Sequence, residues 1–134
     1  MEEADEEGFT PLLWAAREGF YEITQRLLEH GADPNRLDKW MGANAGHKAS
    51  YWRRAEIIPL LARYHLAVNA RGAYNGYTAL HDAVSGGHIQ TVRNLLVAGA
   101  QVDVFGHDGK TPISIARERN ETAILHLLTG KHRN

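Results

Sequence analysis

Histidine is the residue that most invites a chemical role here, because the chain has eight histidines among its 134 residues. Imidazole binds zinc and other transition metals, and it transfers protons near neutral pH. A metal site, however, needs ligands at a fixed spacing, such as an HExxH pair or a tight cluster of histidines and carboxylates. Neither arrangement occurs, and no cysteine is present to supply a thiolate or a disulfide. The sequence therefore predicts no metal site.

Nucleophilic catalysis has no better support. Ser50, Ser85 and Ser114 lack a GxSxG context, and the chain has no glycine-rich phosphate loop. Asp82 directly follows His81, and consecutive side chains leave a helix about 100° apart, so the two form no obvious dyad. We expect no catalytic residue, no bound cofactor and no enzymatic activity.

Composition and charge narrow the class further. The chain is 43% hydrophobic and 23% charged, with a net charge of −1, which is typical of a folded, water-soluble domain. Near neutrality disfavours nucleic acid or an anionic membrane as the main partner. No apolar run approaches the roughly 20 residues of a membrane span, and the acidic N-terminus does not resemble a signal peptide. We expect a cytoplasmic protein, with the nucleus as the alternative.

The elements that carry these residues recur along the chain. Thr10 and Thr78 are 68 residues apart, and Thr78 and Thr111 are 33 apart, so the period is about 34 residues. A further unit is then expected to begin near Asn44. Proline follows the first and last of these threonines, and Thr-Pro is a favourable helix start because the hydroxyl caps the helix and proline takes its first position.

The stretch GYTALHDAVSGGHIQTVRNLLVAGA, from Gly76 to Ala100, resembles an ankyrin repeat, which is a turn followed by two antiparallel helices. The resemblance implies an all-α solenoid of stacked helix pairs joined by β-turn or hairpin loops. In such repeats, the histidines at positions 47 and 81 would bond the backbone of the adjoining turn. The implied repeats are approximately residues 5–38, 39–72, 73–105 and 106–134.

The second repeat departs most from this pattern. Gly46 stands where a core leucine is expected, Arg53 replaces the glycine between the helices, and His65-Leu66 replaces Gly-Ala. Glycine within a helix costs about 1 kcal/mol relative to alanine. We nevertheless expect a helix pair here, with Pro59 in the first turn of its second helix, where proline causes no kink.

The family resemblance also implies a role in binding other proteins, through a groove lined by the turns and by the outward positions of each first helix. Aromatic and arginine side chains are enriched at such binding sites. The candidates for partner binding are Trp14, Lys39, Trp40, Lys48, Tyr51, Trp52, Arg53, Arg54, Arg71, Tyr74, Asp82, Phe105 and His107. Ile115 is placed in the same outward position of the last repeat.

Charge suggests what the groove holds. Between residues 39 and 72 there are six lysines and arginines and a single acid, Glu56. This favours an acidic or phosphorylated peptide segment as the ligand. The competing interpretation is that Trp40 and Trp52 fill the space that the lost leucine and glycine leave, with the arginines simply solvated.

The sequence as a whole therefore predicts a protein–protein interaction module or adaptor, monomeric by itself, that binds a partner protein or peptide. One alternative is a regulatory subunit or an enzyme that uses the histidine-containing groove. A less favoured alternative is nucleic-acid binding through the basic second repeat.

Overall fold

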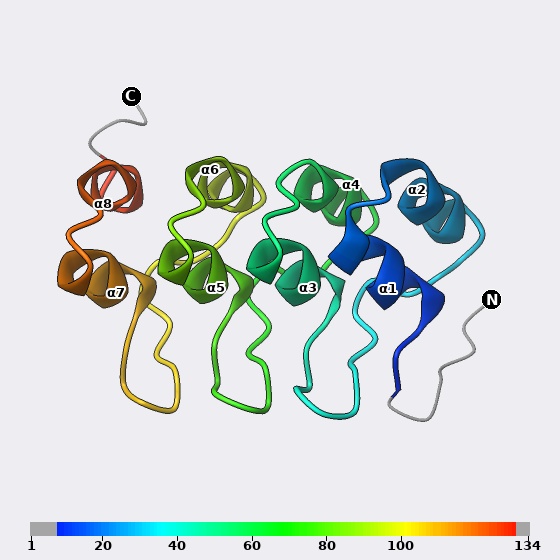
Figure 1. The fold of residues 1–134 in the computed structure, drawn as a ribbon, viewed down its shortest axis with the longest axis horizontal. Coiled ribbons are helices and arrows are strands. Elements are labelled where there is room, and N and C mark those ends of the chain that lie inside the picture. Colours follow the sequence, from blue (N-terminus) through cyan, green and yellow to red (C-terminus); the bar gives the residue numbers. More distant parts are fainter. Residues whose placement is uncertain (1–7, 131–134) are drawn as a thin grey trace.

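The computed structural model describes residues 8–130, which form eight helices in four antiparallel pairs (Figure 1). Within these residues there is no β-strand, and none of the helices is long and apolar enough to cross a membrane. The predicted start of the first repeat, at residue 5, lies outside this range. The helices are α1 (Pro11–Glu18), α2 (Tyr21–Glu29), α3 (Ala45–Tyr51), α4 (Ile57–Arg63), α5 (Ala79–Ser85), α6 (Ile89–Val97), α7 (Pro112–Glu118) and α8 (Thr122–Leu128).

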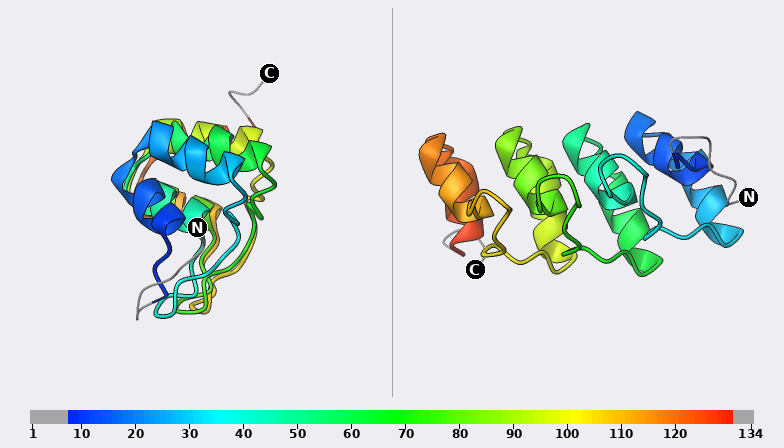
Figure 2. Two further views of the ribbon diagram at one scale, coloured as in Figure 1. Left: turned by 90° about the vertical axis from the view of Figure 1, so that its right-hand side faces the viewer. Right: turned by 90° about the horizontal axis from the view of Figure 1, so that it is seen from below.

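The helices form two layers. The inner helices α1, α3, α5 and α7 pack against one another in sequence, and the outer helices α2, α4, α6 and α8 form a second row, drawn above them in Figure 1. Hairpin loops project from the inner row, so that the molecule is bent in cross-section (Figure 2). The core lies between the layers and is built from leucine, isoleucine, valine and alanine. The predicted all-α ankyrin solenoid is confirmed.

Each inner helix begins at the residue that the period predicts. Thr10, Asn44, Thr78 and Thr111 are the N-caps, and each side chain accepts a hydrogen bond from the backbone N–H three residues later. This bond satisfies one of the N–H groups that a helix start leaves open. The degenerate second repeat therefore keeps both its register and its cap.

Adjacent hairpins lie so close together that glycine is required between them. Gly42 and Gly76 have φ of 59° and 73°, which side chains with a Cβ rarely adopt. A Cβ at Gly42 would lie 2.9 Å from the backbone nitrogen of Ala73, and one at Gly76 would lie 2.9 Å from that of His107. Both the conformation and the space exclude a larger residue.

Buried histidines join neighbouring repeats. In His47, Nε2 lies 2.9 Å from the carbonyl oxygen of Tyr77, and in His81 it lies 2.9 Å from that of Lys110. The other ring nitrogen, Nδ1, accepts the backbone N–H of the N-cap residue in each case. The backbone bonding that the resemblance implied for these two histidines is therefore present.

The second repeat compensates for Gly46 from within. A Cβ built at Gly46 would lie 2.7 Å from Cδ2 of Leu66. Leu66 is buried and stands where the third repeat has Ala100, whereas Gly46 stands where that repeat has Leu80. The large and small residues have exchanged positions, so one leucine still fills the space. Trp40 and Trp52 do not fill it, because they are 71% and 50% exposed.

The other irregularities of this repeat are absorbed locally. Arg53 and His65 have φ of 64° and 69°, the left-handed conformation that Gly19 and Gly31 adopt at the equivalent places in the first repeat. Pro59 is the third residue of α4, where its missing N–H needs no partner. The structure departs from prediction at Ile115, which is 3% exposed; this position of α7 is in the core, not in the groove.

Candidate partner-binding groove

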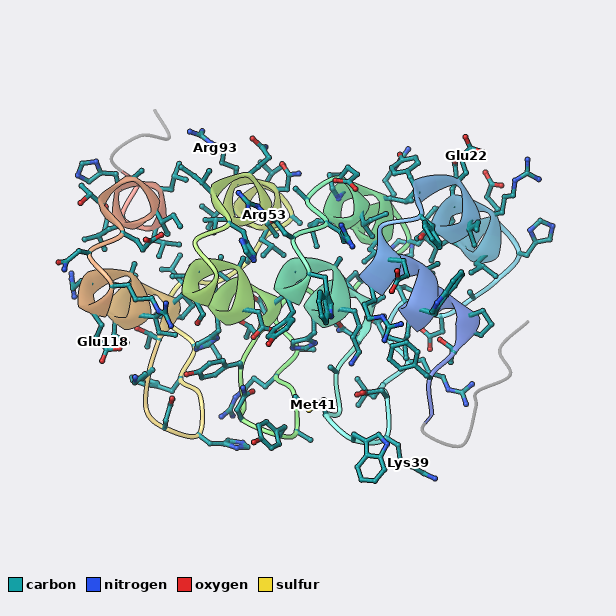
Figure 3. All side chains as sticks on the ribbon, in the orientation of Figure 1. Glu22, Lys39, Met41, Arg53, Arg93 and Glu118 are labelled. Carbon is teal, nitrogen blue, oxygen red and sulfur yellow. The ribbon has the colours of Figure 1, made fainter. Side chains whose placement is uncertain are left out.

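A continuous hollow runs along the inner helices and the hairpins at the centre of the stack. It consists of two adjoining pockets of about 290 and 440 Å³, both of which are lined by Tyr51, Asn75 and Asp82. We call this hollow the groove. Met41 and Lys39 lie on the hairpin side of the molecule, whereas Glu22 and Arg93 lie on the outer helices (Figure 3). The residues that line the groove lie between Met41 and His88, so the groove opens between the second and third repeats.

Aromatic side chains form much of the wall of the smaller pocket, the one of about 290 Å³. Tyr51 at the end of α3, Trp52 after it and Tyr74 on the next hairpin are 63%, 50% and 69% exposed. The rings of Tyr51 and Trp52 meet edge to face, with centroids 5.5 Å apart. Exposed aromatic surface of this kind is typical of binding sites. Three of the predicted partner-binding residues thus lie side by side.

Several of the lysine and arginine side chains predicted to bind a partner instead form an ion pair or hydrogen bonds within the domain. Lys48 Nζ lies 3.0 Å from Oδ2 of Asp38, and their side chains are only 14% and 4% exposed. Asp38 also accepts the backbone N–H of Ala43. Arg54 donates from Nε to the carbonyl of Arg17, and Arg71 donates to that of Gly76. The count of basic residues in the sequence therefore overstates the positive charge that a ligand would meet.

The carboxyl group of Asp82 lies between the two halves of the groove, since Asp82 lines both pockets. Asp82 is partly buried, and no side chain or backbone N–H of residues 8–130 donates a hydrogen bond to it. Burial raises the pKa of Asp82 to about 7, against the attraction of Lys48, which lowers it. Desolvation without a donor disfavours the charged form, so this aspartate reduces the stability of the free domain.

Replacing Asp82 with asparagine is therefore expected to stabilise the domain by about 1–3 kcal/mol above pH 7. The folded-state pKa is above the unfolded-state value of 3.8, so folding binds a proton between these values and stability is lost as pH rises through 7. The gain from Asp82→Asn should shrink on acidification and vanish below pH 4. Urea unfolding at pH 4, 6 and 8 measures it, and a destabilised variant at pH 8 would contradict the prediction.

The remaining candidates lie outside the groove. Trp14 on α1 packs edge to face on Phe20, with centroids 5.0 Å apart. Phe105 and His107 are exposed on the third hairpin, and the backbone N–H of His107 bonds the carbonyl of Asn75. Lys39, Trp40 and Arg53 are exposed next to the groove but do not line it.

Other residues that line the groove were not among the candidates. Met41 and Asn75 lie on the hairpins, and Ser85 and His88 lie around the turn that follows α5. The hairpin positions could have been found from the same outward placement in the repeat. Nothing in the sequence singles out Ser85 and His88. Among the described residues, no group of three or more histidines, aspartates and glutamates is arranged to hold a metal.

Comparison with known proteins agrees with this architecture. A family model described as "Ankyrin repeat" matches residues 7–39, and one described as "Ankyrin repeats (3 copies)" matches residues 47–134. The chain belongs to the ankyrin-repeat family. The residues between the two matches include Gly46, where the second repeat departs from the pattern. Ankyrin repeats are general protein–protein interaction modules, and this role is therefore shown at the level of the family.

Individual relatives of this chain carry names that describe different kinds of protein. The chain is 28% identical to palmitoyltransferase ZDHHC17 of Danio rerio, over 89% of this chain and 24% of that protein. It is 32% identical to the B-cell lymphoma 3 protein homolog of Mus musculus, over 98% of this chain and 28% of that protein. Cyclin-dependent kinase 4 inhibitor B of Mus musculus is 31% identical, with 89% of this chain and 92% of the relative covered. The chain spans about a quarter of the length of the first two.

Proposed function

We propose that this ankyrin domain binds a segment of a partner protein in the groove between its second and third repeats. The observation that supports the proposal is the cluster of exposed aromatic side chains, Tyr51, Trp52 and Tyr74, held on a rigid helical stack beside a hollow. Rigid aromatic side chains bind at a low cost in conformational entropy. The domain would act as a monomeric adaptor, and the cytoplasm remains its predicted compartment.

The proposal does not include catalysis. Two of the histidines at the centre of the stack, His47 and His81, are buried and bonded to backbone on both sides of the ring. Burial also lowers the pKa of both, so that they are neutral at physiological pH. Their contacts are those of structural residues that connect repeats.

The test uses a peptide selected from a random library displayed on phage, with the folded domain as bait. Trp52→Ala is expected to weaken binding of the selected peptide at least tenfold, because truncating a central aromatic residue typically costs 2 kcal/mol or more. Trp40→Ala and Trp52→Ala should each change the free energy of unfolding by less than about 1 kcal/mol, since both side chains are exposed. Fluorescence anisotropy and urea unfolding measure the two quantities.

Val97→Ala is the matched control, because Val97 is 90% exposed on α6 in the outer row. It should leave peptide binding unchanged. If Trp52→Ala bound the peptide as well as the native domain, and protection from hydrogen exchange appeared on the outer helices instead, the groove would not be the binding site. A large loss of stability in either tryptophan variant would restore the packing interpretation.

A further inference from the structure

The groove has a chemical preference that the count of basic residues in the sequence does not reveal. We infer that it binds an arginine side chain of the partner, with the guanidinium on the Asp82 carboxylate and the stem against Tyr51, Trp52 and Tyr74. This inference rests on the proposed function, since it names the part of the partner that the groove receives. It reverses the sign of the ligand that the sequence predicts.

The first observation is the unpaired carboxylate. Asp82 lines both pockets, yet no group of residues 8–130 donates a hydrogen bond to it. The nearby cation that could have paired with it, Lys48, is instead 3.0 Å from Asp38. A hydrogen-bond donor brought by a ligand would complete the site, and a positively charged donor forms the stronger, charge-assisted bond.

The second observation is the chemistry of the walls. An aromatic ring presents a negative face that attracts a cation, and a guanidinium stacks on such a face better than an ammonium does. The exposed rings of Tyr51, Trp52 and Tyr74 stand around the same pocket as Asp82. The three methylenes of an arginine stem would cover apolar ring surface on the way in. Carboxylate and walls therefore favour the same ligand.

An acidic ligand fits this site less well. It would approach Asp82 and the negative ring faces, and Lys48, the lysine of this pocket, is mostly covered and held by Asp38. Arg54 and Arg71, which the sequence counts as basic candidates, donate to backbone carbonyls. Charge complementarity thus points to a cation.

Other titratable groups around the groove do not change this conclusion. His47 of α3 lines one pocket with Asp82, and His88 at the start of α6 lines the other; burial lowers the pKa of both. They are therefore uncharged at neutral pH. Arg53, which also lowers the pKa of His88, is exposed outside the pockets. Burial and the hydrogen bond to Asp108 raise the pKa of Tyr77 to about 12, so that its phenol stays neutral.

The test uses small probes, so that it does not depend on knowing the partner. The domain is titrated with N-acetyl-arginine amide, and the shifts of the backbone amides and of the Trp52 indole N–H are followed by NMR. N-acetyl-citrulline amide is the comparison, because it has the same shape without the charge. We expect the arginine probe to bind at least tenfold more tightly than the citrulline probe, with shifts centred on Asp82, Tyr51 and Trp52.

Variants assign the preference to one carboxylate. Asp82→Asn should abolish the difference between the two probes, whereas Glu22→Gln, on the outer helix α2 (Figure 3), should preserve it. Raising the pH from 6 to 8 should strengthen binding of the arginine probe to the native domain, since it deprotonates Asp82 while arginine stays charged. This last measurement needs no variant.

Several outcomes would overturn the inference. These are equal binding of arginine and citrulline, tighter binding of N-acetyl-glutamate amide, or an Asp82→Asn domain that still prefers arginine. In each case, a selected peptide that still loses binding on Trp52→Ala would leave the proposed function standing. If that peptide were also indifferent to Trp52→Ala, the groove itself would be excluded.

Discussion

Replacing Leu66 with alanine is expected to lower the free energy of unfolding by roughly 2–4 kcal/mol, as large-to-small changes in a packed core do. Leu66 is 8% exposed, and its Cδ2 lies 2.7 Å from the position that a Cβ on residue 46 would take. Because Gly46 has no side chain to move into the vacated space, the cavity should collapse poorly. Urea unfolding followed by circular dichroism measures the loss.

The paired change at Gly46 shows whether the two residues act together. Gly46→Leu alone should destabilise by about 1–3 kcal/mol, since the new side chain meets Leu66. Gly46→Leu combined with Leu66→Ala restores the arrangement of Leu80 and Ala100 in the third repeat, and it should recover most or all of the native stability. It also removes a helical glycine, which is worth about 1 kcal/mol.

The double-mutant cycle should therefore give a coupling energy of at least about 1 kcal/mol. Val97→Ala serves as the control, because this exposed side chain should contribute less than about 0.5 kcal/mol. Strictly additive effects of the two changes would mean that Leu66 does not replace the missing leucine.

Most of the fold could be predicted because it depends on local signals. Thr10, Asn44, Thr78 and Thr111 are small polar residues at a fixed period, and each caps a helix through a bond to a residue three positions away. Contacts between residues so close in the sequence can be recognised from the sequence alone. Because the second repeat keeps the same period, its helix pair could also be predicted, although its signature residues are replaced.

The exchange of Gly46 and Leu66 could not be predicted in the same way. Each residue by itself departs from the repeat pattern, and only their contact across the repeat, from α3 to the turn after α4, shows that one compensates for the other. The prediction that Ile115 lies in the groove is wrong for a related reason. Its position in the repeat is outward in the middle of the stack, but in α7 the same position packs into the core.

The charge of the groove was not predictable because a sequence gives the number of charges and not their pairing. Lys48 counts as a basic residue of the second repeat, yet Asp38, ten positions earlier, holds it. Asp82 counts as one of several acids, yet it is the carboxylate left without a donor in the hollow. Pairing in three dimensions is the basis on which we infer a cationic ligand, where the composition suggests an acidic one.

Replacing His81 with alanine is expected to destabilise the domain by about 3–5 kcal/mol, because it combines a cavity with two unpaired backbone groups. His81 is fully buried. Its Nδ1 accepts the Thr78 backbone N–H, and its Nε2 donates to the Lys110 carbonyl. Its ring also stacks on Tyr77, with centroids 4.4 Å apart. Without the ring, the third repeat loses one of its hydrogen bonds to the fourth.

Glutamine at this position separates the two bonds. Its side chain can accept the Thr78 N–H, as in a capping box, but it does not reproduce the ring that reaches Lys110. His81→Gln should therefore be intermediate between the native domain and His81→Ala in urea unfolding. A His81→Ala domain within 1 kcal/mol of native stability would show that the fourth repeat docks without this bond.

Lowering the pH should weaken the hydrogen bonds that the buried histidines make. Burial lowers the pKa of His47 and His81 below the unfolded value of 6.5, so the unfolded chain binds more protons just below that pH. Stability should then fall as pH drops through 6.5, by up to about 1.4 kcal/mol per pH unit for each histidine. Asp82 acts in the opposite direction, so the slope is best measured in Asp82→Asn. Once protonated, His81 can no longer accept the Thr78 N–H. Adding His81→Ala to that background removes this titrating imidazole and should therefore remove up to one proton from the slope.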